Sequence, residues 1–179
     1  RPALREEMHM ADFDPDLTST FGDLLIRGET TDIKVLDPDG HPNHVLDPAL
    51  PFKVFIEWHL EGSQVPLYLD WPNAEFEIKV FAESMGPGPE VELTSPMRIP
   101  TATGYTGTYF DRTYSAEVDV AANQLPEHMP GGVVEAPGNE PSSGVYKLVT
   151  TVWLNGAIAG PYDVVGFEEG PIIQMESPA

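Results

Sequence analysis

The chain has 179 residues, and its 29 acidic side chains against 9 basic ones give a formal net charge of −20. Such a charge repels phosphate backbones and anionic bilayers, so it argues against nucleic-acid binding and membrane-surface association. The chain has no cysteine and no apolar run long enough to span a bilayer, so we expect no disulfide, no thiol chemistry and no membrane insertion.

An N-terminal extension is predicted for residues 1–29, ahead of a β-sandwich domain over residues 30–179. The first ten residues favour a short helix, which Pro15 would end because proline disfavours a helical residue before it. Near the end of the extension lies an apolar patch that we expect to dock on the domain or on a partner. The patch consists of Leu24, Leu25 and Ile26.

Three carboxylates at alternate positions of the extension form a candidate calcium site. Asp12, Asp14 and Asp16 are spaced like the first ligands of a calcium-binding loop, in which alternate oxygens converge on one ion. Leu17 stands where such a loop needs glycine for its sharp turn. A solvated acidic segment is therefore the simpler interpretation, and calcium is the alternative.

From Thr31 onward, apolar side chains recur at every second position, as expected for half-buried β-strands. The clearest segment is 52–60, where Phe52, Val54, Ile56, Trp58 and Leu60 alternate with polar residues. Asn155-Gly156 suits a two-residue hairpin turn between two later strands. The other predicted strands cover residues 31–35, 65–71, 76–82, 91–93, 114–120, 145–154, 157–167 and 171–175.

These elements predict an all-β fold, an antiparallel β-sandwich of about 7–9 strands with an N-terminal extension. In outline it resembles immunoglobulin-like and fibronectin-like sandwiches, in which a strand tryptophan often packs in the core. Trp58 is the residue of this chain that would fill that place. The likeness concerns architecture and covers residues 31–176, and it implies no particular function.

The densest set of potential metal ligands lies before the 52–60 strand. Asp37, Asp39, His41 and His44 offer two carboxylates and two imidazoles, which suit zinc or a similar ion. However, Asp37-Pro38-Asp39-Gly40 also has the residues of a β-turn, with Asp first, Pro second and Gly fourth. The turn accounts for both aspartates without a metal.

Outward-facing aromatic side chains are candidates for stacking on a sugar ring or for contact with a partner. Phe55 and Phe81 fall at polar-face positions of strands that we expect to be neighbours. The alternative is that these faces are covered by the extension or by a sheet edge. The aromatic candidates are Phe55, Tyr68, Phe81, Tyr105, Tyr109 and Tyr162.

A hydrolase is the weakest of the functional hypotheses. The sequence contains no Gly-x-Ser-x-Gly elbow and no phosphate-binding loop. Glycoside hydrolysis needs two carboxylates held across a cleft, but the candidates occupy polar positions of predicted strands, where solvent exposure explains them. These candidates are Glu57, Glu61, Glu75, Glu77 and Glu83.

The leading hypothesis is a non-enzymatic module that acts by protein–protein contact or self-assembly within a larger protein or surface structure. It rests on the lack of a catalytic motif, on strand edges available for pairing, and on a chain that opens at Arg1 without an initiator methionine. A carbohydrate-binding module with structural calcium is the alternative, and no other cofactor is expected. The sequence does not fix the compartment, although an extracellular or cell-surface location is favoured, and the excess of carboxylates also suits adaptation to high salt.

Overall fold

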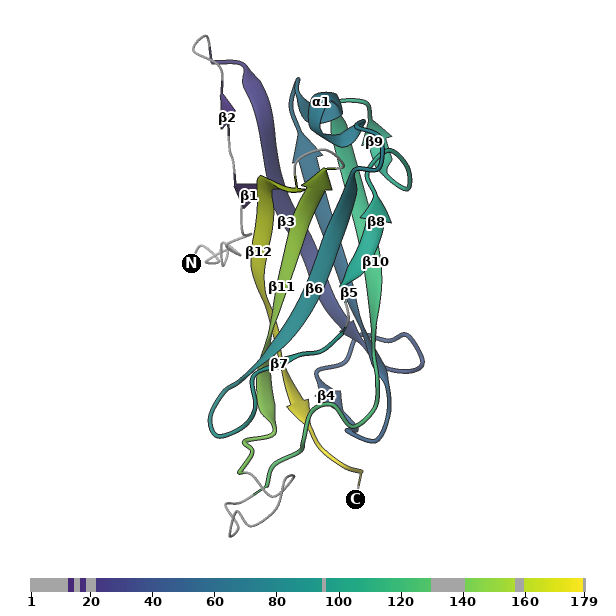
Figure 1. Ribbon diagram of the computed structural model, residues 1–179. Helices are drawn as coiled ribbons and strands as arrows, with labels where there is room; N and C mark the ends of the chain where they lie inside the picture. The colour runs from purple at the N-terminus through teal and green to yellow at the C-terminus, as the bar shows by residue number, and fades with distance from the viewer. Residues whose placement is uncertain are drawn as a thin grey trace, which may run out of the picture.

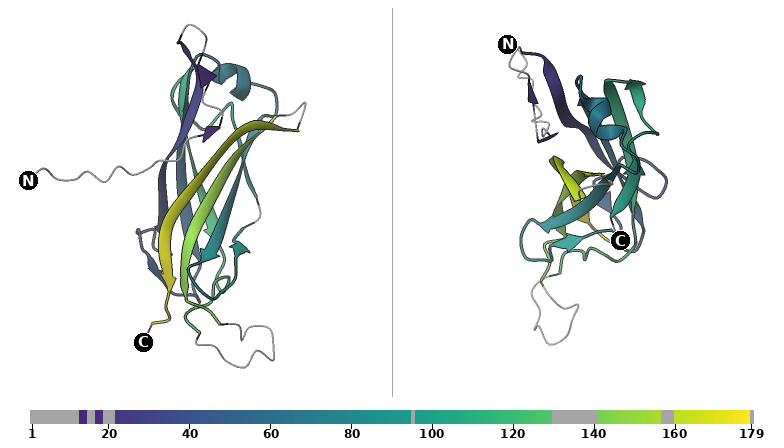
Figure 2. Two further views of the ribbon diagram at one scale, coloured as in Figure 1. Left: turned by 90° about the vertical axis from the view of Figure 1, so that its left-hand side faces the viewer. Right: turned by 45° about the horizontal axis from the view of Figure 1, so that its top comes forward.

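Two β-sheets face each other in the computed structural model, which describes residues 13–14, 17–18, 22–94, 96–129, 141–156 and 160–178. Figure 1 views the molecule with β12, β11 and β6 in front of β3, β5 and β10, and the tilted view of Figure 2 separates the two layers. The five-stranded sheet has the order β2 (Leu17–Thr18), β3 (Leu24–Leu36), β5 (Phe52–Glu61), β10 (Asp111–Val120), β9 (Thr106–Thr108). The seven-stranded sheet has the order β1 (Phe13–Asp14), β12 (Gly160–Met175), β11 (Val145–Gly156), β6 (Glu75–Ser84), β7 (Val91–Glu92), with β4 (Val45–Leu46) beside β12 and β8 (Met97–Pro100) beside β6.

The all-β sandwich predicted from the alternating pattern is confirmed. The described part of the chain contains twelve strands rather than seven to nine, because four of them have only two residues. All strand pairs are antiparallel except β4 with β12, which run parallel. The finer expectation, an immunoglobulin-like or fibronectin-like sandwich, stays a prediction.

Strand β5 is central in its sheet and shows how the sequence pattern becomes a core. It pairs with β3 on one side and with β10 on the other. Its five alternating apolar residues, from Phe52 to Leu60, are all buried, while the residues between them are only half-buried. Each such side chain stabilises the fold by about 1.5–3 kcal/mol through removal of apolar surface from water.

Trp58 lies in the core, as predicted, within an aromatic cluster that joins the two sheets. Its ring stacks on Tyr114 of β10 at a centroid distance of 5.7 Å and meets the edge of Phe76 of β6 at 5.2 Å. The Tyr114 hydroxyl donates to the backbone oxygen of Thr101 at 2.6 Å, and burial raises the pKa of Tyr114 to about 12. Contacts of this kind add to area burial because aromatic pairs prefer stacked and edge-on geometries.

The strand predicted for residues 65–71 is wrong, because residues Val65–Leu69 form helix α1. Val65 and Leu69 are both buried whereas Leu67 is exposed, as expected when side chains four apart share one helical face. Pro66 lies in the first turn, where its missing N–H costs no hydrogen bond. The apolar spacing fits both the period of a strand and the period of a helix, and the proline favours the helix.

The hairpin between β11 and β12 is present, but the predicted turn at Asn155-Gly156 is wrong. Asn155 pairs with Pro161 and Gly156 with Gly160, so both residues belong to strand β11. Pairing of Asn155 with Glu75 of β6 on the other side extends the strand past the sequence signal. The connecting residues 157–159 lie outside the described residues.

The predicted boundary after residue 29 falls inside β3, since β3 begins at Leu24. Residues Arg27, Gly28 and Glu29 already pair with β5, and Ile26 is buried in the core. The helix expected over residues 1–10 lies outside the described residues. Within the part of the chain that the structure describes, no helix has the length and apolar character needed to cross a membrane.

Candidate functional site

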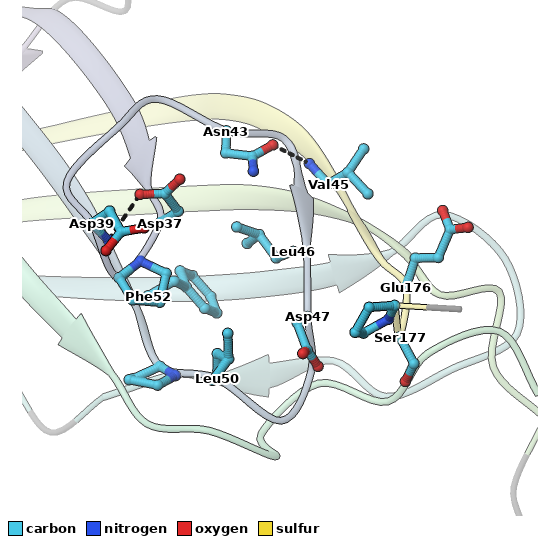
Figure 3. A pocket seen from close by; sticks show the side chains of 13 residues that line it. Asp37, Asp39, Asn43, Val45, Leu46, Asp47, Leu50, Phe52, Glu176 and Ser177 are labelled. Carbon is cyan, nitrogen blue, oxygen red and sulfur yellow. Dashed lines mark hydrogen bonds between the residues drawn. The ribbon is translucent and has the colours of Figure 1, made fainter.

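A pocket of about 710 Å³ opens at the end of the sandwich that carries β4 and the C-terminal tail. Figure 1 shows β4 and the C-terminus at this end of the molecule, and Figure 3 shows the pocket from close by. We call it the end pocket. It is formed by the connection from β3 through β4 to β5, together with the residues that follow β12. The lining residues are 37–39, 43, 45–47, 50–52 and 176–178.

Polar side chains shape the connection that forms the end pocket by accepting hydrogen bonds from nearby backbone. Asp37 Oδ1 accepts from the N–H groups of Asp39 at 3.0 Å and His41 at 2.9 Å. Asp47 Oδ1 accepts from the N–H of Ala49 at 2.8 Å. Because each aspartate uses one oxygen for its turn, its second oxygen is not required by the loop.

The C-terminal tail closes the opposite side of the end pocket. The N–H of Glu176 donates to the backbone oxygen of Leu46 at 2.9 Å, which ties the tail to β4. The N–H of Ser177 donates to Glu127 Oε2 at 3.0 Å. Hydrogen bonds from Ser177 lower the pKa of Glu127, so this carboxylate stays charged and holds the tail in place.

The end pocket combines an apolar base with an entirely anionic set of charges. Leu46 and Phe52 are buried, and Leu50 is 47% exposed. Figure 3 places Leu46 and Leu50 between Asp37 and Asp39 on one side and Asp47 on the other. Glu176 is the fourth carboxylate among the lining residues, which include no Lys, Arg or His. A site of this size and composition suits a ligand that is cationic and partly apolar.

The predicted metal ligands before β5 come partly together at the edge of this pocket. Ligand atoms of Asp37, Asp39 and His41 lie within 4.8 Å of one another, whereas His44 is not part of that group. The backbone hydrogen bonds to Asp37 account for its position without an ion. A metal site here remains a prediction.

The predicted calcium ligands cannot be placed as a group. Asp12 and Asp16 lie outside the described residues, and only the backbone of Asp14 is described, in β1. The calcium site therefore also stays a prediction.

A second cluster of potential metal ligands, which the sequence did not reveal, lies on the outer face of the five-stranded sheet. Ligand atoms of His59, Glu61 and Asp111 lie within 4.8 Å of one another. His59 Nε2 is 2.8 Å from Asp111 Oδ1, and Arg27 forms an ion pair with Glu61. The His59–Asp111 hydrogen bond and the Arg27–Glu61 ion pair account for these positions without a metal, and only the strand register, which a single sequence does not show, brings the residues together.

Phe55 and Phe81 were expected on neighbouring strands, and this expectation is wrong. Phe55 belongs to β5 of the five-stranded sheet, where Lys34 Nζ lies 5.5 Å from its ring centroid. Phe81 belongs to β6 of the seven-stranded sheet. The chain crosses from one sheet to the other through α1, so the two rings face opposite sides of the sandwich.

The remaining predicted contact residues contribute to the packing of the domain. Tyr68 of α1 is half-buried and packs against the core. In β3, Ile26 is buried, and Leu24 and Leu25 are half-buried. Their role as a surface for a partner remains a prediction.

The carboxylates considered for hydrolysis are divided between the two outer faces of the sandwich. Glu57 and Glu61 lie on β5, while Glu75, Glu77 and Glu83 lie on β6. Arg98 donates to Glu75 at 2.8 Å and to Glu77 at 3.0 Å. None of the five lines the end pocket.

Comparison with known proteins gives no relative from which a function could be inferred. No family model, no curated protein and no solved structure matched it. We therefore infer function from the end pocket and from the charge of the molecule.

Proposed function

We propose that this protein is a non-enzymatic contact module that binds a basic segment of a protein partner in the end pocket. The observation that carries the proposal is the lining of that pocket, in which four carboxylates surround an apolar base and no cationic side chain is present. Because like charges repel at close range, these carboxylates favour occupation by a positive group.

Lysine and arginine side chains match both parts of this lining. Each has an apolar stem that can cover Leu46, Leu50 and Phe52, and each carries a charged head that reaches Asp37, Asp39 or Asp47. Arginine can in addition form a bidentate pair with a carboxylate. A basic peptide segment therefore fits the end pocket better than an isolated metal ion, which has no use for the apolar base.

The charge of the whole chain favours a basic partner over a second copy of this protein. At −20, two copies repel each other, whereas a basic partner is steered toward the surface and associates faster at low salt. Self-association remains the second form of the contact hypothesis. It would require a neutral interface away from the end pocket.

The proposal is tested with a short capped peptide that alternates leucine and lysine and with its analogue in which norleucine replaces lysine. We expect the lysine peptide to bind in calorimetry at low salt and to weaken as NaCl is added. The norleucine peptide, which keeps the apolar stem but lacks the charge, should bind much more weakly.

A matched pair of double variants separates the end pocket from general surface charge. Replacing Asp39→Asn together with Glu176→Gln removes two lining charges, and Glu90→Gln with Glu92→Gln removes two exposed charges elsewhere. We expect the first pair to weaken peptide binding about tenfold, from roughly 0.7 kcal/mol per lost charge contact, and the second pair to weaken it far less. Equal weakening by both would contradict the proposal.

A further inference from the structure

A hollow of about 360 Å³ lies on the outer face of the seven-stranded sheet, away from the end pocket. We call it the sheet hollow. Side chains of two neighbouring strands form it, three from β6 and three from β11. They are Glu77, Lys79, Phe81, Thr151, Trp153 and Asn155.

The strand register places two aromatic rings on opposite sides of the sheet hollow. Lys79 and Thr151 are directly opposite each other, and Glu77 is opposite Trp153. Phe81 lies two residues beyond Lys79 in the other direction, so the rows of Phe81 and Trp153 are separated by roughly 13 Å along the strands. The two rings therefore border a space whose centre is the Lys79–Thr151 pair.

Fixed polar groups supply the rest of the lining. Arg98 Nη2 donates to Glu77 Oε2 at 3.0 Å, and Asn155 Nδ2 lies 3.3 Å from the same oxygen. Lys79 Nζ is 3.7 Å from the other oxygen of Glu77. These contacts hold one carboxylate between two cations and an amide. The hollow thus has hydrogen-bonding groups of both kinds without a dominant charge.

Exposed aromatic rings mark the sheet hollow as a place for a ligand. Trp153 is 39% exposed, and Phe167, opposite Thr151 on β12, is 51% exposed. Exposed rings of this size beside a hollow are more typical of a binding surface than of a solvated sheet.

We propose that the sheet hollow binds a sugar ring of a neutral glycan. A pyranose ring has apolar C–H faces, which stack on an aromatic ring such as that of Trp153 or Phe81, and hydroxyl edges that both donate and accept hydrogen bonds. Glu77 and Asn155 offer acceptors, and Lys79 and Asn155 offer donors. An added β-strand would not fit here, because the backbone groups of β6 and β11 are already paired with each other. This site is independent of the end pocket.

The experiment is affinity electrophoresis of the full chain in gels that contain soluble neutral polysaccharides, preceded by a glycan array to select them. The key variant is Trp153→Ala, and its matched control is Trp71→Ala, since Trp71 is equally exposed at 39% but lies on the connection after α1. We expect Trp153→Ala to lower the affinity obtained from the retardation at least tenfold and Trp71→Ala to leave this affinity unchanged. The Asp39→Asn, Glu176→Gln protein should be retarded like the wild type, at low and at high salt.

The outcomes distinguish the site from a loss of fold and from the end pocket. The melting temperature of each variant is measured first, to show that it is folded. Lys79→Ala is a second substitution in the sheet hollow, and it leaves both aromatic rings in place. Weaker retardation in both Trp153→Ala and Lys79→Ala supports the proposal. It is overturned if the array shows no binding to any neutral glycan, or if retardation survives both substitutions.

Discussion

Arg112 is a buried charged residue whose pairing matters for the stability of the fold. Its side chain is fully buried in β10, and its Nη1 donates to Asp70 Oδ1 at 2.8 Å. Its Nε donates to the backbone oxygen of Tyr109 at 3.1 Å, and the guanidinium lies 4.5 Å from the ring centroid of Tyr105. A buried charge is tolerated only when it is paired, so Asp70 holds the end of α1 against β10.

We predict that Asp70→Asn lowers the free energy of unfolding by about 3 kcal/mol, because it leaves the buried charge of Arg112 without its partner. This value is at the low end for breaking a buried ion pair, since Asp70 is itself one-third exposed. The hydrogen bond from Arg112 lowers the pKa of Asp70 below its ordinary value of 3.8. The ionised carboxylate therefore stabilises the fold above that pH, and the contribution is lost as the pH falls through the lowered pKa. In urea unfolding, the free energies of unfolding of the wild type and of Asp70→Asn should therefore become equal below about pH 4.

The control for this pair is Asp119→Asn, which removes a carboxylate that is 84% exposed and lies 3.9 Å from Lys53. An exposed ion pair of this kind should change the free energy of unfolding by less than about 0.5 kcal/mol. The interpretation of Arg112 fails if both substitutions have the same effect at pH 7.

The connection from β5 to α1 depends on a glycine at residue 62. Gly62 has a φ of 131°, and a Cβ at this position would lie 2.3 Å from the backbone oxygen of Leu25 in β3. Gly40 in the turn after β3 also has a positive φ, of 83°, but a Cβ there would meet nothing within 4 Å. Substitution of Gly62 therefore adds a steric conflict to the backbone strain, whereas substitution of Gly40 causes backbone strain alone.

We predict that Gly62→Ala destabilises the protein by at least about 2 kcal/mol, because β3 and β5 must separate to admit the methyl group. Gly40→Ala should cost about 1 kcal/mol, from its left-handed conformation alone. Chemical unfolding of both variants measures the difference. If Gly40→Ala proves the more harmful substitution, the close approach of Gly62 to β3 is not a constraint in solution.

The elements that the sequence predicted correctly are those with long, strict alternation. The 52–60 pattern became β5 because each apolar residue could reach one core. The 65–71 pattern was too short to distinguish a strand from a helix, since Val65 and Leu69 share a face in either case. Asn155-Gly156 was placed in a strand by pairing with β6, a partner that local turn chemistry cannot reveal.

Neither the end pocket nor the sheet hollow could be predicted completely. Turn chemistry identified Asp37 and Asp39, but the tail residue Glu176 joins them only because β12 ends beside β4. In the same way, Phe81 was recognised as an outward aromatic, while its place across the sheet hollow from Trp153 follows from the β6–β11 register. A single sequence gives the faces of strands and does not give their neighbours.

The net charge of −20 acts on the molecule as a whole. Self-repulsion destabilises the compact state, and salt reduces it because the Debye length falls from about 30 Å at 0.01 M to about 3 Å at 1 M. We predict that the melting temperature rises over this range of NaCl. Sucrose at equal osmolality serves as the control for excluded-solute effects. A flat or falling melting temperature in NaCl would mean that the ion pairs of the surface outweigh the repulsion.

The most direct test of the proposed contact function is a titration of the ¹⁵N-labelled chain with the leucine–lysine peptide, followed by two-dimensional NMR at low salt. The account predicts saturable shifts of the amide signals of Val45, Leu46, Asp47 and Leu50 around the end pocket, with Trp153 unaffected. Shifts that are spread over the acidic surface, or that are absent from these four residues at saturation, would contradict it.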